Sequence, residues 1–188
     1  TSSGAQIGDY YNGISSASST LLGDLNTLIN PHNYISYFLY KTTLMSQFEV
    51  KDTTNGQSYV TCCYSGENKV FNDPFDWSDN NYSREHTYAH SWMGTFPCND
   101  PEQEEYADQH NLYPANLPNA NSPRSNLPLE DISGDVVFNY LGGSVGYNGN
   151  GQLVYEPRAS HKGNAARAIF YMATCYTGNG GNNWAVPT

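Results

Sequence analysis

The tripeptide Arg84-Glu85-His86 brings together three side chains that phosphodiester hydrolysis uses. A histidine with an ordinary pKa of about 6.5 can take a proton from water at neutral pH. A glutamate offers hard oxygen ligands to a divalent cation, and an arginine can hold a phosphate. A surface strand with one hydrogen-bonded histidine has the same composition, so the tripeptide indicates a nuclease only together with other segments.

More side chains of these kinds follow along the chain. Four of the five histidines lie between His86 and His161, and the later segments are Asp108-Gln109-His110-Asn111 and Asn121-Ser122-Pro123-Arg124. Base, cation ligand and phosphate-binding residue are therefore available within one region.

Elements of both secondary-structure types must position these residues. Leucines at helical spacing predict a helix over residues 20–29 that stops at Asn30-Pro31. Residues 34–45 fit a helix or a buried strand, with helix preferred. Residues 50–81 alternate aromatic runs with turn residues, which predicts short strands and long loops.

Residues 162–173 predict a second helix whose core face carries Ala166, Ile169, Phe170 and Ala173. The Gly- and Asn-rich residues 177–188 predict a loose tail. A chain of 188 residues fits one α+β domain over residues 1–188, and 16 Tyr, 7 Phe and 3 Trp predict an aromatic core.

The cysteines indicate where the protein acts. Four cysteines without a Cys-x-x-Cys spacing favour disulfides, and therefore a secreted or periplasmic protein. Neighbouring residues do not readily pair, so Cys62 and Cys63 would each reach one of Cys98 and Cys175. Buried free thiols are the alternative. No apolar run is long enough to span a membrane, and any leader would already have been removed.

The formal net charge of −10 is evidence against a nucleic-acid partner. Only eight lysines and arginines are present, but five of them, including every arginine, lie between Arg84 and Arg167. Local and weak binding of a polyanion would suit an enzyme that must release its products. It would suit a sequence-specific DNA reader poorly.

Five ordered segments together resemble the bacterial endonuclease I family, secreted or periplasmic nucleases of the His-Me finger (ββα-metal) group. The likeness covers roughly residues 8 to 176, and its segments are Arg84-Glu85-His86 with Ser91-Trp92, Asp108 to Pro114, Asn121 to Asn126, Tyr155 to Arg158, and Lys162 to Thr174.

This resemblance implies a ββα finger over about residues 82–126. His86 matches the general base, and Glu85 and Asn121 match the side-chain ligands of a single Mg²⁺, for which Mn²⁺ or Ca²⁺ could substitute. The substrates would be DNA and RNA, cleavage would leave a 5′-phosphate, and the enzyme would be a monomer.

Further roles follow from the resemblance and from the residue types. His110 and Asn111 match a block that supports the finger. Arg84, Arg124, Arg158 and Arg167 are the candidates for phosphate contacts, and internal ion pairs such as Arg167 with Glu156 are the alternative. Because neighbours on a regular strand face opposite ways, Glu85 and His86 predict an irregular strand end.

Two departures from the family pattern stand out. No Arg or Lys occurs from Thr87 to Ala107, where family members often carry a phosphate-binding arginine. The sequence also stops soon after Thr174, whereas family members usually continue into an Asn-rich, Pro-Phe-containing segment.

Other patterns carry competing interpretations. His86 and His90 at i and i+4 could serve a zinc hydrolase, although the glutamate between them is missing. An aromatic-rich module that binds glycans is the non-enzymatic alternative. The acidic residues 73–79 and 100–108 fit solvated loops, and Asn81-Tyr82-Ser83 is a glycosylation sequon.

Overall fold

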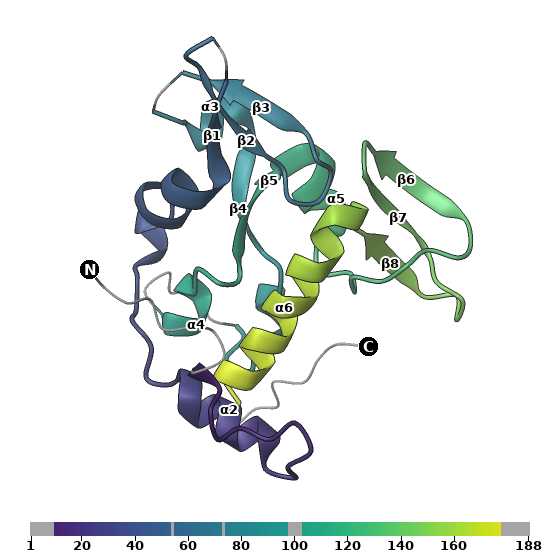
Figure 1. Cartoon of the computed structure of the whole chain (residues 1–188). Coiled ribbons are helices and arrows are strands. Elements are labelled where there is room, and N and C mark those ends of the chain that lie inside the picture. The colour runs from purple at the N-terminus through teal and green to yellow at the C-terminus, as the bar shows by residue number, and fades with distance from the viewer. Residues whose placement is uncertain (1–9, 54, 73, 98–102, 178–188) are drawn as a thin grey trace.

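A computed structural model describes residues 10–53, 55–72, 74–97 and 103–177. Three small antiparallel sheets surround one long helix, α6 (Ala159–Cys175), which crosses the molecule diagonally in Figure 1. The predicted α+β class and the single domain are confirmed.

The first sheet has the order β1-β2-β3, the second pairs β4 with β5, and the third has the order β6-β7-β8. The strands are β1 (Val50–Asp52), β2 (Ser58–Thr61), β3 (Asn68–Phe71), β4 (Tyr82–His86), β5 (Leu112–Asn116), β6 (Val136–Tyr140), β7 (Gly143–Tyr147) and β8 (Leu153–Glu156). Short strands and loops over residues 50–81 are thus confirmed.

Most of the other helices are short. They are α2 (Leu21–Ile29), the 3-10 helices η1 (Tyr37–Leu39) and η3 (His90–Trp92), the π-helices η2 (Lys41–Glu49) and η4 (Leu117–Asn121), and the α-helices α3 (Trp77–Asn80), α4 (Glu104–Ala107) and α5 (Ser122–Arg124). The helix predicted over residues 20–29 is confirmed, with Asn30 as its C-cap. The helix preferred over residues 34–45 forms in part, from Tyr37 onward. No helix of the described residues is both long and apolar enough to cross a bilayer.

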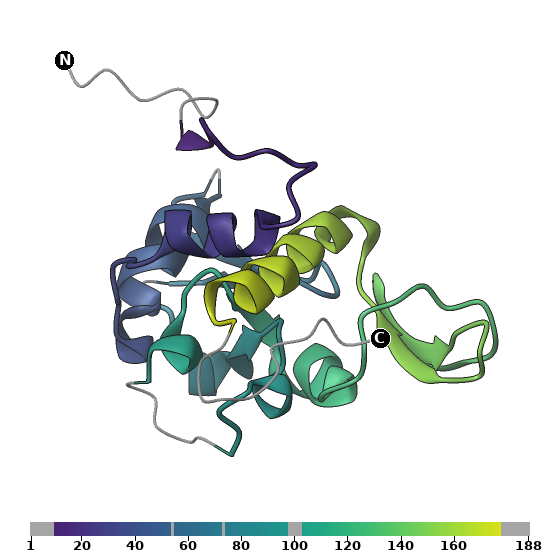
Figure 2. The ribbon, with the colours of Figure 1, turned by 90° about the horizontal axis from the view of Figure 1, so that it is seen from below.

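The second predicted helix forms as α6, but its buried face was assigned wrongly. Ala166 and Phe170 are exposed, and the buried residues are His161, Ala165, Ala168, Met172 and Cys175. These mostly small side chains let neighbouring elements approach the helix axis closely, and α2 lies alongside α6 (Figure 2). The helix carries two apolar stripes, and the sequence alone does not show which of them is buried against other elements.

The core is aromatic, as expected. The larger buried cluster includes Tyr40, Tyr64, Phe75 and Tyr82, and it lies between the first sheet and the β4–β5 pair. A smaller cluster around Tyr88 and Met172 packs the inner face of α6.

The predicted disulfides are absent among the described residues: Cys62, Cys63 and Cys175 are buried free cysteines, and Cys98 lies outside the described residues. Cys62 and Cys63 belong to the larger cluster and Cys175 to the smaller one, so they are not placed to bond with one another. The alternative of buried thiols is the one observed. A hydrogen bond from the Cys63 side chain lowers the pKa of Cys62 to about 6.

The buried His161 makes the stability of the fold dependent on pH. Its side chain packs edge-on against Tyr64 and Tyr113, and burial lowers its pKa to about 4 from 6.5. Between pH 6.5 and about pH 4 the histidine is therefore protonated in the unfolded chain and neutral in the folded chain. The free energy of unfolding must fall as the pH decreases through this range.

The free energy of unfolding should decrease between pH 7 and pH 4 by about 2 to 3 kcal/mol less in His161→Leu than in the wild-type protein. Urea unfolding of both proteins between pH 7 and pH 4 measures it. Parallel pH profiles for the two proteins would contradict the assignment.

Candidate active site

The tripeptide lies at the end of a two-stranded ribbon. β4 pairs with β5 in a continuous antiparallel register, with Glu85 opposite Tyr113 and His86 opposite Leu112. η4 and α5 follow β5 directly and return a helical segment to β4. The predicted irregularity at Glu85 and His86 is wrong, because the pairing runs unbroken through both residues.

Glu85 is a buried carboxylate, with 4% of its surface exposed. Its Oε1 accepts hydrogen bonds from the Tyr64 hydroxyl at 2.9 Å and from an Arg124 guanidinium nitrogen at 3.0 Å. Its Oε2 contacts the Asn121 side-chain amide. The two predicted cation ligands, Glu85 and Asn121, are thus in direct contact.

Burial dominates the electrostatics of this carboxyl group. It raises the pKa of Glu85 to about 7, even though the charge of Arg124 and the hydrogen bond from Tyr64 both favour the ionised form. A divalent cation at the same oxygens would add further charge compensation. The carboxylate and amide oxygens of this pair are the ligands that Mg²⁺, Mn²⁺ and Ca²⁺ prefer, so the residues fit such an ion.

His86 has one ring nitrogen committed and one available. Its Nε2 lies 2.7 Å from the carbonyl oxygen of Tyr106. A carbonyl oxygen only accepts hydrogen bonds, so Nε2 carries the proton and Nδ1 keeps its lone pair. The ring stacks on Tyr37 and contacts Tyr106. Burial lowers the pKa of His86 to about 4 against the opposing effect of the Tyr106 carbonyl, and a neutral imidazole can accept a proton at pH 7.

Arg124 is buried, with 1% of its surface exposed, and its guanidinium holds the end of β4. Besides Glu85 it donates to the carbonyl oxygens of His86 at 3.1 Å and of Thr87 at 2.6 Å. The Trp92 ring lies 4.8 Å from its central carbon. The guanidinium therefore fixes the carboxylate and the backbone around it.

The other arginines lie in different surroundings. Arg84 stacks over the Tyr37 ring at 4.0 Å and donates to the Tyr37 carbonyl oxygen at 3.2 Å. Arg158 donates to the Cys63 carbonyl oxygen at 2.8 Å. Arg167 is exposed on α6, and its partner is Asn164. Glu156, the carboxylate considered for Arg167, pairs with Lys162 instead.

The returning segment of the ribbon is held by Asn111, which is fully buried. Its side chain accepts a hydrogen bond from the Tyr88 backbone nitrogen at 2.6 Å and donates to the Tyr88 carbonyl at 3.1 Å. The neighbouring His110 is exposed and bonds Asp108 at 3.1 Å, which raises the pKa of His110.

The zinc-hydrolase interpretation of His86 and His90 loses its basis. His86 ends β4 and His90 begins η3, so the two imidazoles do not share one helical face. The acidic loop has a similarly plain role, because Asp76 caps α3 by accepting from the Asp79 backbone nitrogen. Asp73 lies outside the described residues.

Three further residues complete the site: Trp92 belongs to a segment of the family resemblance, whereas Tyr64 and Tyr106 were not singled out from the sequence. Tyr64 bonds Glu85, Trp92 covers Arg124, and Tyr106 orients His86 through a backbone carbonyl. Tyr106 leaves no signal in the sequence, because any residue supplies a carbonyl. Tyr64 is one of 16 tyrosines, and nothing marks it out before the fold is known.

Comparison with known proteins gives consistent results. The family model described as Endonuclease I matches residues 17–184. The chain is 28% identical over 184 residues to a protein of Bacillus subtilis (strain 168) named extracellular ribonuclease, covering 94% of this chain and 57% of that protein. A protein of the same name from Bacillus amyloliquefaciens is 30% identical over 173 residues, covering 92% of this chain and 55% of that protein. The chain thus spans about half the length of these relatives. No solved structure matches it.

The Arg124–Glu85 pair makes a prediction about stability. In metal-free protein, Arg124→Met leaves the carboxylate buried without its cation, and removing one partner of a buried pair costs about 3 to 5 kcal/mol. The loss should grow as the pH rises from 6 to 9, because a carboxyl group with a raised pKa is neutral at the lower end and charged at the upper end.

Urea unfolding in excess chelator measures this loss. Arg167→Met, which removes an exposed arginine from α6, should cost less than about 0.5 kcal/mol and serves as the matched control. Combining Arg124→Met with Glu85→Gln should abolish the pH dependence. If the single and double variants show the same pH profile, Arg124 does not compensate Glu85.

Proposed function

The chain belongs to the endonuclease I family, and on that premise we propose that it is a divalent-cation-dependent nuclease that hydrolyses phosphodiester bonds in RNA and DNA. The observation that carries the proposal is the contact between Glu85 and Asn121 next to a histidine whose Nδ1 is unprotonated. Two oxygen ligands and a base at the end of one ribbon form the minimal apparatus for metal-assisted hydrolysis.

His86 is the general base of this proposal. Its Nδ1 takes the proton of a water molecule, the water oxygen attacks phosphorus, and the bond from phosphorus to the 3′ oxygen breaks, with the leaving 3′ oxygen taking a proton from solvent. The products are a 5′-phosphate and a 3′-hydroxyl. The Tyr106 carbonyl holds the ring in the tautomer that this step needs, since it occupies the protonated Nε2.

Glu85 and Asn121 would hold the cation, with the Asn121 amide turned so that its oxygen faces the metal. When bound, the ion would stabilise the negative charge that develops on the phosphate oxygens and on the leaving oxygen. Glu85 and His86 point to opposite faces of the ribbon, and β4 has no second neighbour among the described strands of its sheet. Arg124 occupies that edge at the His86 carbonyl oxygen, so a phosphate would approach at the end of the ribbon, beyond His86. We take residues 82–126, which comprise β4, β5 and the helical return, as the ββα finger of the family.

The arginines divide into two groups. Arg124 acts as a positioning residue, because its guanidinium is buried against Glu85 and the β4 carbonyls. Arg84, Arg158 and Arg167 are the candidates for phosphate contacts. Arg84 lies on the same strand face as His86 and packs on the same tyrosine, Tyr37. Asn111 and His110 support the returning strand of the finger.

The name of the two relatives, extracellular ribonuclease, supports RNA as a substrate and secretion as the destination. DNA is included because water is the attacking group in this mechanism. The reaction therefore does not require the 2′-hydroxyl that distinguishes RNA from DNA. We propose a secreted or periplasmic monomer, with Mg²⁺ as the cation and Mn²⁺ or Ca²⁺ as possible substitutes.

His86→Ala should lower kcat by about 100- to 10,000-fold on plasmid DNA and on RNA, as expected for loss of a general base. The melting temperature and the Mg²⁺ concentration for half-maximal activity should stay near their wild-type values. Cleavage at the wild-type rate by this variant would refute the mechanism.

Chelation should abolish cleavage, and added Mg²⁺ should restore it. Asn121→Ala and Glu85→Gln should each raise the Mg²⁺ concentration for half-maximal activity by at least about 10-fold, because each removes one of two protein ligands. Lys51→Ala, an exposed change on β1, should leave that concentration unchanged. Cleavage that persists in excess chelator would exclude a required cation, and end-labelling of the products tests for the 5′-phosphate.

A further inference from the structure

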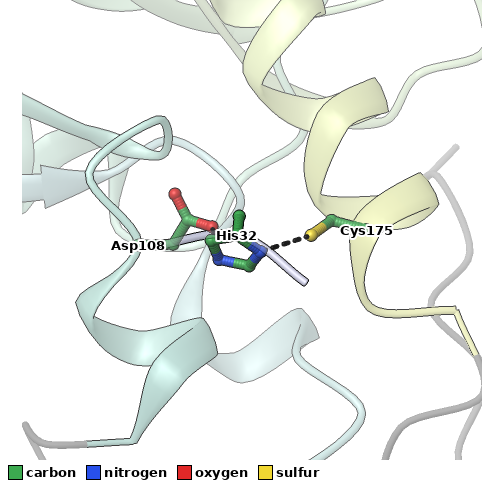
Figure 3. A group of neighbouring side chains, drawn as sticks. All are labelled: His32, Asp108 and Cys175. Atoms are coloured by element: carbon green, nitrogen blue, oxygen red, sulfur yellow. Dashed lines mark hydrogen bonds and ion pairs between the residues drawn. The ribbon is translucent and has the colours of Figure 1, made fainter. Parts of the chain in front are cut away.

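Three side chains from distant segments meet beneath the last turn of α6: His32, Asp108 and Cys175 (Figure 3). One nitrogen, one oxygen and one sulfur from these residues all lie within 4.8 Å of one another. The Cys175 sulfur is 3.6 Å from His32 Nδ1, and Asp108 Oδ2 is 3.5 Å from His32 Nε2. The nuclease mechanism uses none of these groups.

A second carboxylate faces the imidazole from the side of Nε2. Glu104, in the first turn of α4, places its Oε1 3.2 Å from His32 Nε2. A recess of about 40 Å³ lined by His32, Glu104, Asp108 and His110 opens beside the cluster. Since the Asp108 side chain is 2% exposed and that of Glu104 is 49% exposed, the site has a closed base and an entrance from solvent.

The imidazole is oriented as a metal ligand requires. His32 Nε2 lies 3.2 Å from Glu104 Oε1, an oxygen that only accepts, so Nε2 can carry the proton. Nδ1 then faces Asn30 Oδ1 at 3.2 Å and the Cys175 sulfur at 3.6 Å, and it can bind an ion. The Asn30 amide nitrogen donates to the carbonyl oxygens of Asn26 and Cys175, which fixes the direction of its oxygen. Histidines that bind metals characteristically donate their other nitrogen to a carboxylate, as His32 can to Glu104.

We propose that His32, Asp108 and Cys175 bind a zinc ion, with Asn30 Oδ1 as the fourth ligand, in a structural site separate from the one at Glu85 and Asn121. A thiolate and an imidazole select zinc over magnesium or calcium, and four protein ligands are typical of structural zinc sites. Ligand atoms about 2.0 to 2.3 Å from zinc in a tetrahedron lie roughly 3.3 to 3.7 Å apart. The Cys175 thiol loses its proton to solvent when the ion binds.

The same three residues also stand in the order of a Cys-His-Asp catalytic triad. The Cys175 side chain is 3% exposed, however, and it packs among Tyr88, Met93 and Met172 in the smaller core cluster. No substrate can reach its sulfur without opening the end of α6. Ion binding needs no such access, because the ion enters from the Glu104 side.

Without metal, the cluster is a hydrogen-bonded network. The Tyr171 and Tyr176 hydroxyls donate to Asp108 Oδ2 at 3.0 and 2.7 Å, and the Tyr176 hydroxyl lies 3.3 Å from His32 Nε2. Zinc must displace part of this network. The alternative is that these residues form only a structural hydrogen-bond network, in which case the protein would bind no metal here.

A bound ion would act on the catalytic region through α4. Glu104 and Tyr106 belong to the same short helix, and the Tyr106 carbonyl oxygen accepts the hydrogen bond from His86. Fixing Glu104 would therefore hold the turn that orients His86. The ion would also tie α4 to the end of α6 and to the segment that follows α2.

The test uses Co²⁺ and Zn²⁺ with the full chain after treatment with chelator. One equivalent of Co²⁺ should give the absorption of tetrahedral Co²⁺ together with a thiolate-to-cobalt charge-transfer band, and Zn²⁺ should displace it and raise the melting temperature. Cys175→Ala should lose the charge-transfer band. His32→Gln should weaken Zn²⁺ binding by at least about 100-fold, and Asn30→Ala by about 10- to 100-fold through loss of a ligand.

Cys62→Ala is the control, since it removes a buried thiol far from the cluster and should leave the band unchanged. Glu104→Gln keeps an exposed, near-isosteric side chain and should still weaken Zn²⁺ binding at least about 10-fold, because the His32 imidazole loses the carboxylate that orients it, and this separates an effect on binding from loss of folding. A chain that binds no Zn²⁺, or a band that survives in Cys175→Ala, would overturn the proposal. None of these measurements depends on nuclease activity.

Discussion

The structure around the β4–β5 ribbon depends on one costly constraint, the burial of the Glu85 carboxylate. Taking a charged carboxylate out of water costs several kcal/mol unless charge and hydrogen bonds compensate it. Arg124 supplies the positive charge, the Tyr64 hydroxyl donates a hydrogen bond to Oε1, and the Asn121 amide donates one to Oε2. Three different elements must therefore converge on one side chain, and the raised pKa of Glu85 indicates that the compensation is incomplete. A cation at these oxygens would complete it.

Arg124 links this constraint to the rest of the fold. Its guanidinium also binds the carbonyl oxygens of His86 and Thr87, where the chain leaves β4. The loop that follows returns through α4, whose Tyr106 carbonyl orients His86, and through Asn111, which is bonded to Tyr88. Glu85 and His86 are thus held by neighbouring parts of residues 82–126, and α6 packs against α2.

The sequence was sufficient for elements with a strong local signal. The helix ending at Asn30, the strands of residues 50–81 and the α+β class were all predicted. The inner face of α6 was not, since two apolar stripes compete and only tertiary packing decides between them. The disulfides were inferred from the number of cysteines, which carries no geometry. Glu85, His86 and Asn121 came from the family resemblance, whereas Tyr64 and Tyr106 required the fold.

The arginine contacts bear on how a chain of net charge −10 could hydrolyse a polyanion. Arg124 is committed to Glu85 and Arg158 to the Cys63 carbonyl, while Arg84 is stacked on Tyr37. Of the arginines, only Arg124 has its charge balanced by a carboxylate of the described residues, so Arg84, Arg158 and Arg167 keep theirs, and a bound cation would add to this small local attraction. Binding would then be confined to the scissile phosphate and its neighbours, and repulsion from the remaining acidic surface would favour release of the cleaved strands.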